Sequence, residues 1–195
     1  MMFKLIMGGI IGGVIAFICS FISWGVLSWH EVTINKFTDQ DCVAQVIQEN
    51  AHVDGVYIAP FESFSPEKGQ EFKKQEMQLR GKPFIYAQVK TQGIDLCRPS
   101  YYIYSFLNQC VGAMLIGFLL KKMVKSTYGE RLFCVIIMGL MVGFLGLVPS
   151  WIWFGAGYSY TLMMMLETLI QWLFAGLFLA GFIKPPRSNS EGLTV

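Results

Sequence analysis

One carboxylate, Glu167, lies in an apolar stretch that is long enough to cross a lipid bilayer. Residues 158–183 contain no other charged side chain. A charged group near the centre of a bilayer costs about 2.5–3.5 kcal/mol on insertion scales, so it normally faces the interior of a helix bundle or a wet cavity. Glu167 therefore marks a candidate polar site inside a membrane.

Polar side chains of two other apolar stretches are expected at a similar depth. With about 1.5 Å of rise per residue, we place Asn108 roughly 10 Å below the outer boundary, Glu167 roughly 13 Å, and two serines of the first stretch roughly 9–14 Å. We therefore predict that Glu167 lies within the bundle and hydrogen-bonds to Asn108 or Gln109, with a glutamine one turn deeper. The predicted intramembrane polar locus comprises Glu167, Gln171, Asn108, Gln109, Ser20 and Ser23.

Three roles are open to this locus. Its groups can hold helices together, since interhelical hydrogen bonds contribute about 0.6–2 kcal/mol each. They can instead handle a proton or a ligand, or contact the helix of a partner. We expect the first role. Because an amide keeps the shape of the carboxyl group but does not titrate, Glu167→Gln should be tolerated by a structural site and not by a proton-handling one.

Signals of catalysis or metal binding are weak in this sequence. His30 and His52 are the only histidines, and with scattered acids they lack metal-ligand spacing. Three consecutive methionines at 163–165 point around a helix and do not converge on an ion. The sequence also lacks G-x-S-x-G, H-E-x-x-H and P-loop motifs. We expect no metal, no cofactor and no enzymatic activity.

Four apolar stretches are the elements that must position the locus. The chain of 195 residues is 54% hydrophobic and 14% charged, which is too apolar for an ordinary soluble domain. A hydrocarbon core of roughly 30 Å needs about 20 apolar residues in a helix. We predict an all-α polytopic membrane protein, a four-transmembrane-helix bundle with a small α+β extracytoplasmic domain between helices 1 and 2. Its segments are transmembrane helices at 5–29, 101–120, 132–148 (stopped by Pro149) and 158–183, the outer domain at 30–99, a basic cytoplasmic loop at 121–131, a short outer loop at 149–157 and a cytoplasmic tail at 184–195.

Lysine and arginine predict the orientation, because short loops rich in these residues stay in the cytoplasm. The connection 121–131 contains three lysines and Arg131, the tail contains one lysine and one arginine, and Lys4 precedes the first stretch. That stretch exceeds the about 7–15 apolar residues of a signal peptide, so we expect an uncleaved anchor. Because no N-glycosylation sequon or sorting signal is visible, we expect a bacterial inner membrane, with both termini cytoplasmic and residues 30–99 periplasmic or extracellular.

The outer domain at 30–99 has a mixed composition. It holds eight Lys/Arg and ten Asp/Glu, a net charge of −2, and it lacks the basic stripe of a nucleic-acid-binding surface. Local propensity and capping signals predict one α-helix followed by a possible second, and two strands that are able to pair. These are a helix from Thr38 to about Asn50, a second helix start at Ser65-Pro66, and strands at 56–59 and 84–90.

Cys42 and Cys97 are the only cysteines of the outer domain. If that side of the membrane is oxidising, they should pair. Closing a loop of this length would stabilise the domain by roughly 4 kcal/mol in the chain-entropy model. A redox-active pair is the alternative, although the spacing is unlike C-x-x-C. We predict a structural disulfide.

Small residues recur at four-residue spacing in the apolar stretches, and such pairs let helix backbones approach closely. The pattern fits packing within one chain as well as dimerisation. The pairs are Gly8/Gly12, Gly9/Gly13, Gly139/Gly143 and Gly176/Ala180.

From these features we expect a non-enzymatic membrane accessory or assembly protein whose outer domain or helices bind another membrane component. The alternative is a small transporter or channel subunit that uses the polar site around Glu167. The expected partners are the lipid bilayer and either a membrane protein or a second copy of the chain, and no nucleic acid is expected.

Overall fold

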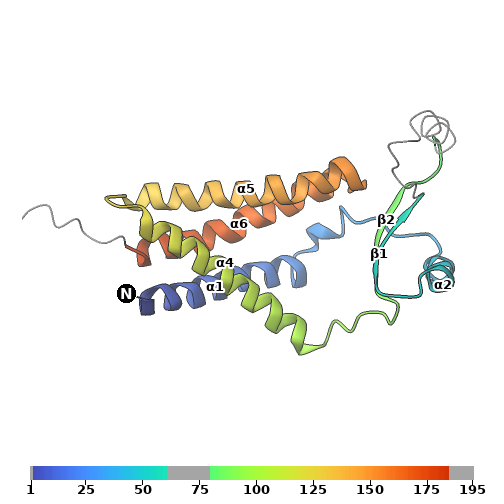
Figure 1. Ribbon diagram of the computed structural model, residues 1–195, viewed down its shortest axis with the longest axis horizontal. Helices are drawn as coiled ribbons and strands as arrows, with labels where there is room; N and C mark the ends of the chain where they lie inside the picture. The colour runs from blue at the N-terminus through green and yellow to red at the C-terminus, as the bar shows by residue number, and fades with distance from the viewer. Residues whose placement is uncertain (1, 61–79, 185–195) are drawn as a thin grey trace, which may run out of the picture. The chain divides into compact units, whose positions relative to one another are not determined.

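Four long apolar helices dominate the computed structural model, which describes residues 2–60 and 80–184. Each helix is long and apolar enough to cross a membrane. The predicted combination of four such helices with a small two-stranded sheet is confirmed. The helices are α1 (Met2–Gly25), α4 (Pro99–Lys122), α5 (Tyr128–Phe154) and α6 (Tyr158–Phe182) (Figure 1).

The first apolar stretch ends its helix earlier than predicted. α1 stops at Gly25, and Ser28–His30 form a separate 3-10 turn, η1. The backbone N–H groups of Val26 and Leu27 both donate to Ile22 O, so the α-helical hydrogen-bond ladder closes there. His30 therefore follows the helix in a turn of its own, and it belongs to the same compact unit as the four helices.

The third helix is longer than predicted at both ends. It begins at Tyr128 because Thr127 and Glu130 form a capping box: Thr127 N–H donates to Glu130 Oε2 at 2.7 Å, and Glu130 N–H donates to Thr127 Oγ1 at 3.3 Å. The prediction that Pro149 stops this helix is wrong, since α5 continues through it. A proline removes only one backbone donor, and apolar helices tolerate that loss when neighbouring groups are satisfied. Gly155, with φ +74°, ends the helix instead.

Glycines on α1 form its contacts with α4 and α6. A Cβ atom at Gly9 would meet Met114, and one at Gly13 would meet Cys110, both on α4. Gly12 faces Leu179 of α6 as well as α4. The α1 pattern of small residues therefore serves packing within the chain.

The pair α5 and α6 packs by the same principle. Gly176 of α6 faces Val135 of α5, and Gly139 of α5 faces Trp172 of α6, whose ring also lies against Gly112 of α4. The buried core of the four helices consists of Ala113, Ile116, Leu120, Val135, Leu179 and Ile183.

A second compact unit comprises residues 36–60, 80–95 and 150–156 of the described chain. Its helix α2 (Gln40–Asn50) begins at Asp39, whose carboxylate accepts the N–H of Cys42 at 2.9 Å. Strands β1 (Gly55–Ala59) and β2 (Ile85–Val89) form an antiparallel pair, whereas the sequence predicts only that the two strands are able to pair. The predicted second helix start at Ser65-Pro66 lies outside the described residues.

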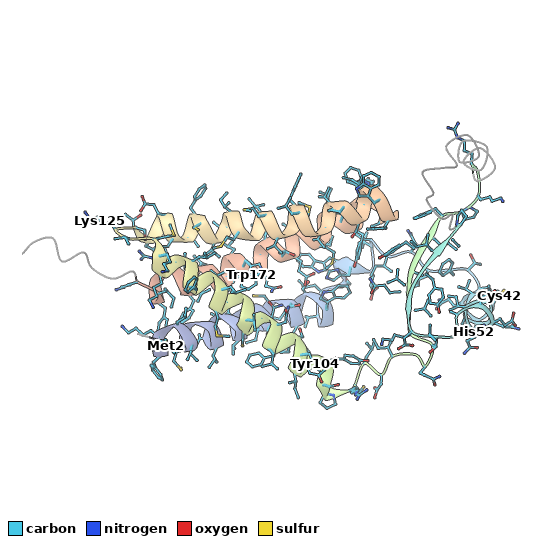
Figure 2. The ribbon with its side chains drawn as sticks, viewed as in Figure 1. Met2, Cys42, His52, Tyr104, Lys125 and Trp172 are labelled. Carbon is cyan, nitrogen blue, oxygen red and sulfur yellow. The ribbon has the colours of Figure 1, made fainter. Side chains whose placement is uncertain are left out.

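Cys42 and Cys97 belong to different units. Cys42 lies on α2 in the second unit (Figure 2). Cys97 precedes α4 in the first unit. Both are exposed, and no disulfide joins them within the described part of the chain. The Cys42–Cys97 disulfide stays a prediction.

Candidate functional site

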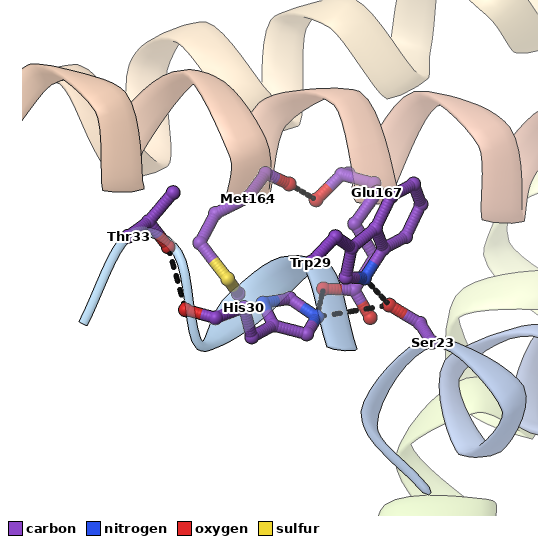
Figure 3. A network of polar contacts seen from close by, with 7 residues as sticks. Ser23, Trp29, His30, Thr33, Met164 and Glu167 are labelled. Carbon is purple, nitrogen blue, oxygen red and sulfur yellow. Dashed lines mark hydrogen bonds and ion pairs between the residues drawn. The ribbon is translucent and has the colours of Figure 1, made fainter. Parts of the chain in front are cut away.

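Glu167 is buried on α6, with 6% of its surface exposed, and its partner is not the predicted one. Its Oε2 lies 3.4 Å from Nε2 of His30, which is itself 4% exposed (Figure 3). The predicted hydrogen bond from Glu167 to Asn108 or Gln109 is therefore corrected: the carboxylate faces η1 and the end of α1. Since the turn at 28–30 folds back onto α6, a residue assigned to the outer domain reaches the acid.

Ser23 connects the acid–histidine pair to α1. Its Oγ lies 3.0 Å from His30 Nε2 and accepts a hydrogen bond from Trp29 Nε1 at 3.1 Å. The backbone holds His30 in place, because its carbonyl accepts the N–H and the hydroxyl of Thr33, both at 3.0 Å (Figure 3). We call Ser23, His30 and Glu167 the polar cluster.

Two tryptophans enclose the imidazole of His30. Trp24 stacks on it, with ring centroids 3.8 Å apart and planes 8° from parallel. Trp29 meets it edge-on, at 5.9 Å and 80°. The indole face of Trp24 and the carboxyl group of Glu167 therefore contact the same imidazole, one at its face and the other at Nε2.

Of the other four predicted residues, Gln171 and Gln109 contact each other, and Ser20 and Asn108 lie apart from them. Gln171 Nε2 donates to Gln109 Oε1 at 2.7 Å, which joins α6 to α4 one turn from Glu167. Ser20 is half-buried, and Asn108 is exposed on α4. Neither contributes a hydrogen bond to the polar cluster within the described residues. The predicted single locus is thus divided: Ser23 and Glu167 belong to the buried polar cluster, Gln171 and Gln109 form a part-buried contact, and Ser20 and Asn108 join neither.

A cavity of about 360 Å³ adjoins the polar cluster. Ser23, Glu167 and Gln171 line it among apolar side chains of α1 and α6, and Trp29 contributes from η1. Glu167 Oε2 is buried and makes the 3.4 Å contact with His30 Nε2, whereas the buried His30 Nδ1 has no hydrogen-bond partner within the described residues.

The distance from Ser23 Oγ to His30 Nε2 is that of a nucleophile and its general base, a pair that the sequence did not reveal. A hydrolytic triad also requires an acid on the other ring nitrogen, where it fixes the tautomer. Here Glu167 approaches the same Nε2, and Nδ1 has no acceptor among the described residues. The geometry fits hydrogen bonding and charge pairing better than acyl transfer.

A buried cation, Arg131, lies at the start of α5. It was predicted as part of a basic loop, yet it is 6% exposed. Its Nε donates to Ala180 O at 2.8 Å, and its Nη1 donates to Ser126 O. Because carbonyls near the end of α6 carry negative partial charge, the guanidinium is well placed there.

His30, Trp24 and Trp29 are the residues that sequence reasoning missed. A usable signal was present: the chain has two histidines, and one of them follows Trp24 and Trp29 at the end of the first apolar stretch. Its pairing with Glu167 depends on a backbone turn that no local pattern specifies. Comparison of the chain with protein-family models, with curated protein sequences and with solved structures found no match.

Proposed function

We propose that this chain is a non-enzymatic integral membrane protein of the accessory or assembly type, whose helices bind another membrane protein. The observation that supports this proposal is Asn108, which is exposed on α4. At about 1.5 Å per residue, it lies about 13 Å along the helix from Pro99. Placing an amide in hydrocarbon without a hydrogen bond costs about 4–8 kcal/mol on the water-to-cyclohexane scale, so a partner helix is its natural acceptor.

The proposed orientation places both termini and the α4–α5 turn in the cytoplasm of a bacterium, and the second unit outside the inner membrane. Lys121, Lys122 and Lys125 at the turn support this choice. A chain in which Cys42 is the only cysteine tests it. We expect a membrane-impermeant maleimide to label Cys42 in cells whose outer membrane alone is permeabilised. Labelling that requires disruption of the inner membrane would contradict the orientation.

A photoreactive amino acid at position 108 tests the partner proposal. We expect a protein adduct at position 108 and none at position 145, because Leu145 is exposed on α5 and apolar. The crosslink identifies the partner protein. Asn108→Leu should reduce the amount of that partner that co-purifies with the chain in mild detergent by about 3- to 30-fold, the range that one interhelical hydrogen bond gives. Equal adducts at both positions, or unchanged recovery with Asn108→Leu, would contradict the proposal.

The polar cluster favours a second candidate, a small transporter or channel subunit. Glu167 and His30 are ionisable, buried, and adjacent to a cavity, and ionisable groups inside membrane helices often mark ion or proton pathways. Purified protein in liposomes should then give proton-dependent flux that Glu167→Ala abolishes. The absence of flux with the wild-type chain would leave the accessory role as the better proposal.

A further inference from the structure

Three lysines from three different elements line one cavity, at the end of the bundle where α1 begins and α4 and α6 end (Figure 1). Lys4 belongs to the first turn of α1, Lys121 to the last turn of α4, and Lys184 follows α6. We call this the basic cavity. Its volume of about 460 Å³ lies within the range of ligand pockets, roughly 300–1,000 Å³. Because the lysines are far apart in the sequence, only the packing of the helices brings them together.

Close packing fixes the elements around the basic cavity. A Cβ atom at Gly117 of α4 would lie 3.0 Å from Leu5 Cδ1 and 3.6 Å from Ile183 Cγ1. The start of α1 and the end of α6 therefore both contact α4 at this glycine. Leu5 and Ile183 also line the cavity. Since Lys4 and Lys184 are the sequence neighbours of these two residues, their backbones are held by the packed bundle.

The basic cavity carries positive charge that no nearby acid compensates. α1 and α4 contain no Asp or Glu, and the single acid of α6, Glu167, lies roughly four turns before the end of that helix and contacts His30. Within the described part of the chain, no carboxylate forms an ion pair with the three lysines. Lys121 is also half-buried, so its ammonium group is less free to turn into water. A negatively charged ligand would satisfy these groups.

The apolar lining favours a lipid as the source of that negative charge. Phe3 and Phe182 line the same cavity, and both are exposed. Ammonium groups and apolar surface therefore lie next to each other, as the binding of an amphiphile requires. Basic pockets between transmembrane helices bind anionic lipid headgroups on the cytoplasmic side of membranes, and the proposed orientation places this end there. A free phosphate would use the lysines and leave the aromatic rings uncovered.

We propose that the basic cavity binds an anionic phospholipid, whose phosphate contacts the ammonium groups of Lys4, Lys121 and Lys184 and whose acyl chains lie along Phe3 and Phe182. The site requires that the helices cross a membrane, but it is independent of the proposed partner surface. Asn108 lies about 20 Å along α4 from Lys121, so the two tests fail separately.

Lipid binding by the purified full chain in a neutral detergent tests the site. Native mass spectrometry compares its affinity for phosphatidylglycerol and for phosphatidylcholine with identical acyl chains. Both lipids carry a phosphate, but choline cancels its charge. We expect phosphatidylglycerol to bind about tenfold or more tightly, because each lysine near an anionic lipid contributes about fivefold. Equal affinities would overturn the proposal.

A soluble competitor distinguishes a lipid from a free phosphate. Glycerol phosphate has a phosphate group but no acyl chain. We expect it to displace little phosphatidylglycerol even in large molar excess, because it gains nothing from the aromatic rings. Displacement as effective as that by unlabelled phosphatidylglycerol would make the ligand a soluble phosphate and overturn the choice of a lipid.

Lysine variants assign the binding to this cavity. Lys121→Gln should weaken phosphatidylglycerol binding about fivefold, Lys4→Gln should do the same from a second helix, and Lys121→Arg should retain binding because it keeps the charge. Lys122→Gln is the matched control. It removes the same charge one residue along, but Lys122 lies over the ring of Phe118, 5.5 Å from its centroid, and does not line the cavity. It should leave the affinity nearly unchanged.

Two results with these variants would contradict the assignment. Equal losses in Lys121→Gln and Lys122→Gln would show attraction by diffuse surface charge and overturn the site. Loss of binding in Lys121→Arg would trace the effect to packing and overturn the role of the charge at that position.

Discussion

Replacing Gly13 with alanine tests the closest approach of α1 to α4. A Cβ atom at Gly13 would lie 2.6 Å from Cys110 Sγ, 2.7 Å from its Cα and 2.8 Å from its backbone nitrogen. The last two are backbone atoms, which cannot rotate away as the end of a side chain can. To restore an ordinary contact of 3.4 Å to the Cα, the two helices must part by about 0.7 Å.

The expected loss follows from that separation. A gap of 0.5–1 Å forfeits about a quarter to a half of the dispersion well between atoms that were in contact. Overpacking costs about 1–3 kcal/mol, and the better helix propensity of alanine returns about 1 kcal/mol. Because the clash involves backbone, we take the upper half of the range and expect Gly13→Ala to lower the free energy of unfolding by about 1–2 kcal/mol. Titration of mixed micelles with SDS, followed by circular dichroism, measures it.

Two further glycines serve as controls. A Cβ atom at Gly146 of α5 meets nothing within 4 Å, so Gly146→Ala should leave the free energy of unfolding unchanged or raise it by up to about 1 kcal/mol. The three atoms nearest to a Cβ atom at Gly9 all belong to the side chain of Met114, and the nearest, Cγ, can rotate, so Gly9→Ala should cost less than Gly13→Ala. If Gly13→Ala proves as stable as Gly146→Ala, the reasoning from backbone contact is wrong.

Three other changes probe the polar contacts. A hydrogen bond from Lys90 lowers the pKa of Asp54 from 3.8 to about 2. The ionised Asp54 therefore stabilises the second unit above pH 4, and this stabilisation is lost as the pH falls towards 2. Asp54→Asn should remove this pH dependence of the hydrogen-exchange protection of β1. Arg131→Met should lower the free energy of unfolding by about 1.5–3 kcal/mol in SDS titration, since two carbonyls lose a charged donor. A double-mutant cycle of Glu167→Gln with His30→Ala should give a coupling of about 0.5–3 kcal/mol, and simple additivity would show that the two side chains do not interact.

The number and approximate position of the long helices follow from the sequence because apolar run length is a local property. Their ends do not, since they depend on particular contacts. Pro149 is a strong stop signal by itself, yet the helix passes it and ends at Gly155, whose positive φ suits only a few residue types. The start at Tyr128 was encoded locally, in the Thr127–Glu130 capping box.

The candidate site was only half predictable for a related reason. The burial of Glu167 was predictable, because a carboxylate on an apolar helix is costly in hydrocarbon and normally faces the interior of the bundle. The identity of its partner depends on how far α1 extends. Continuing α1 as a helix to Trp29 would leave His30 at the start of the outer domain. Ending it at Gly25 lets the turn at 28–30 bring the imidazole back to α6.

The glycines of α1 and the polar cluster depend on each other. Gly8 and Gly12 bring α1 against Leu179 of α6 and against Ile183, which follows that helix. Ser23 follows Gly12 by about three turns and lies beside His30 and Glu167. A wider spacing of α1 and α6 would move Ser23 and His30 away from the acid and leave a carboxylate facing hydrocarbon in the proposed membrane. The small residues of α1 therefore support the polar cluster, because they hold α1 close enough to α6 for Ser23 and His30 to reach Glu167.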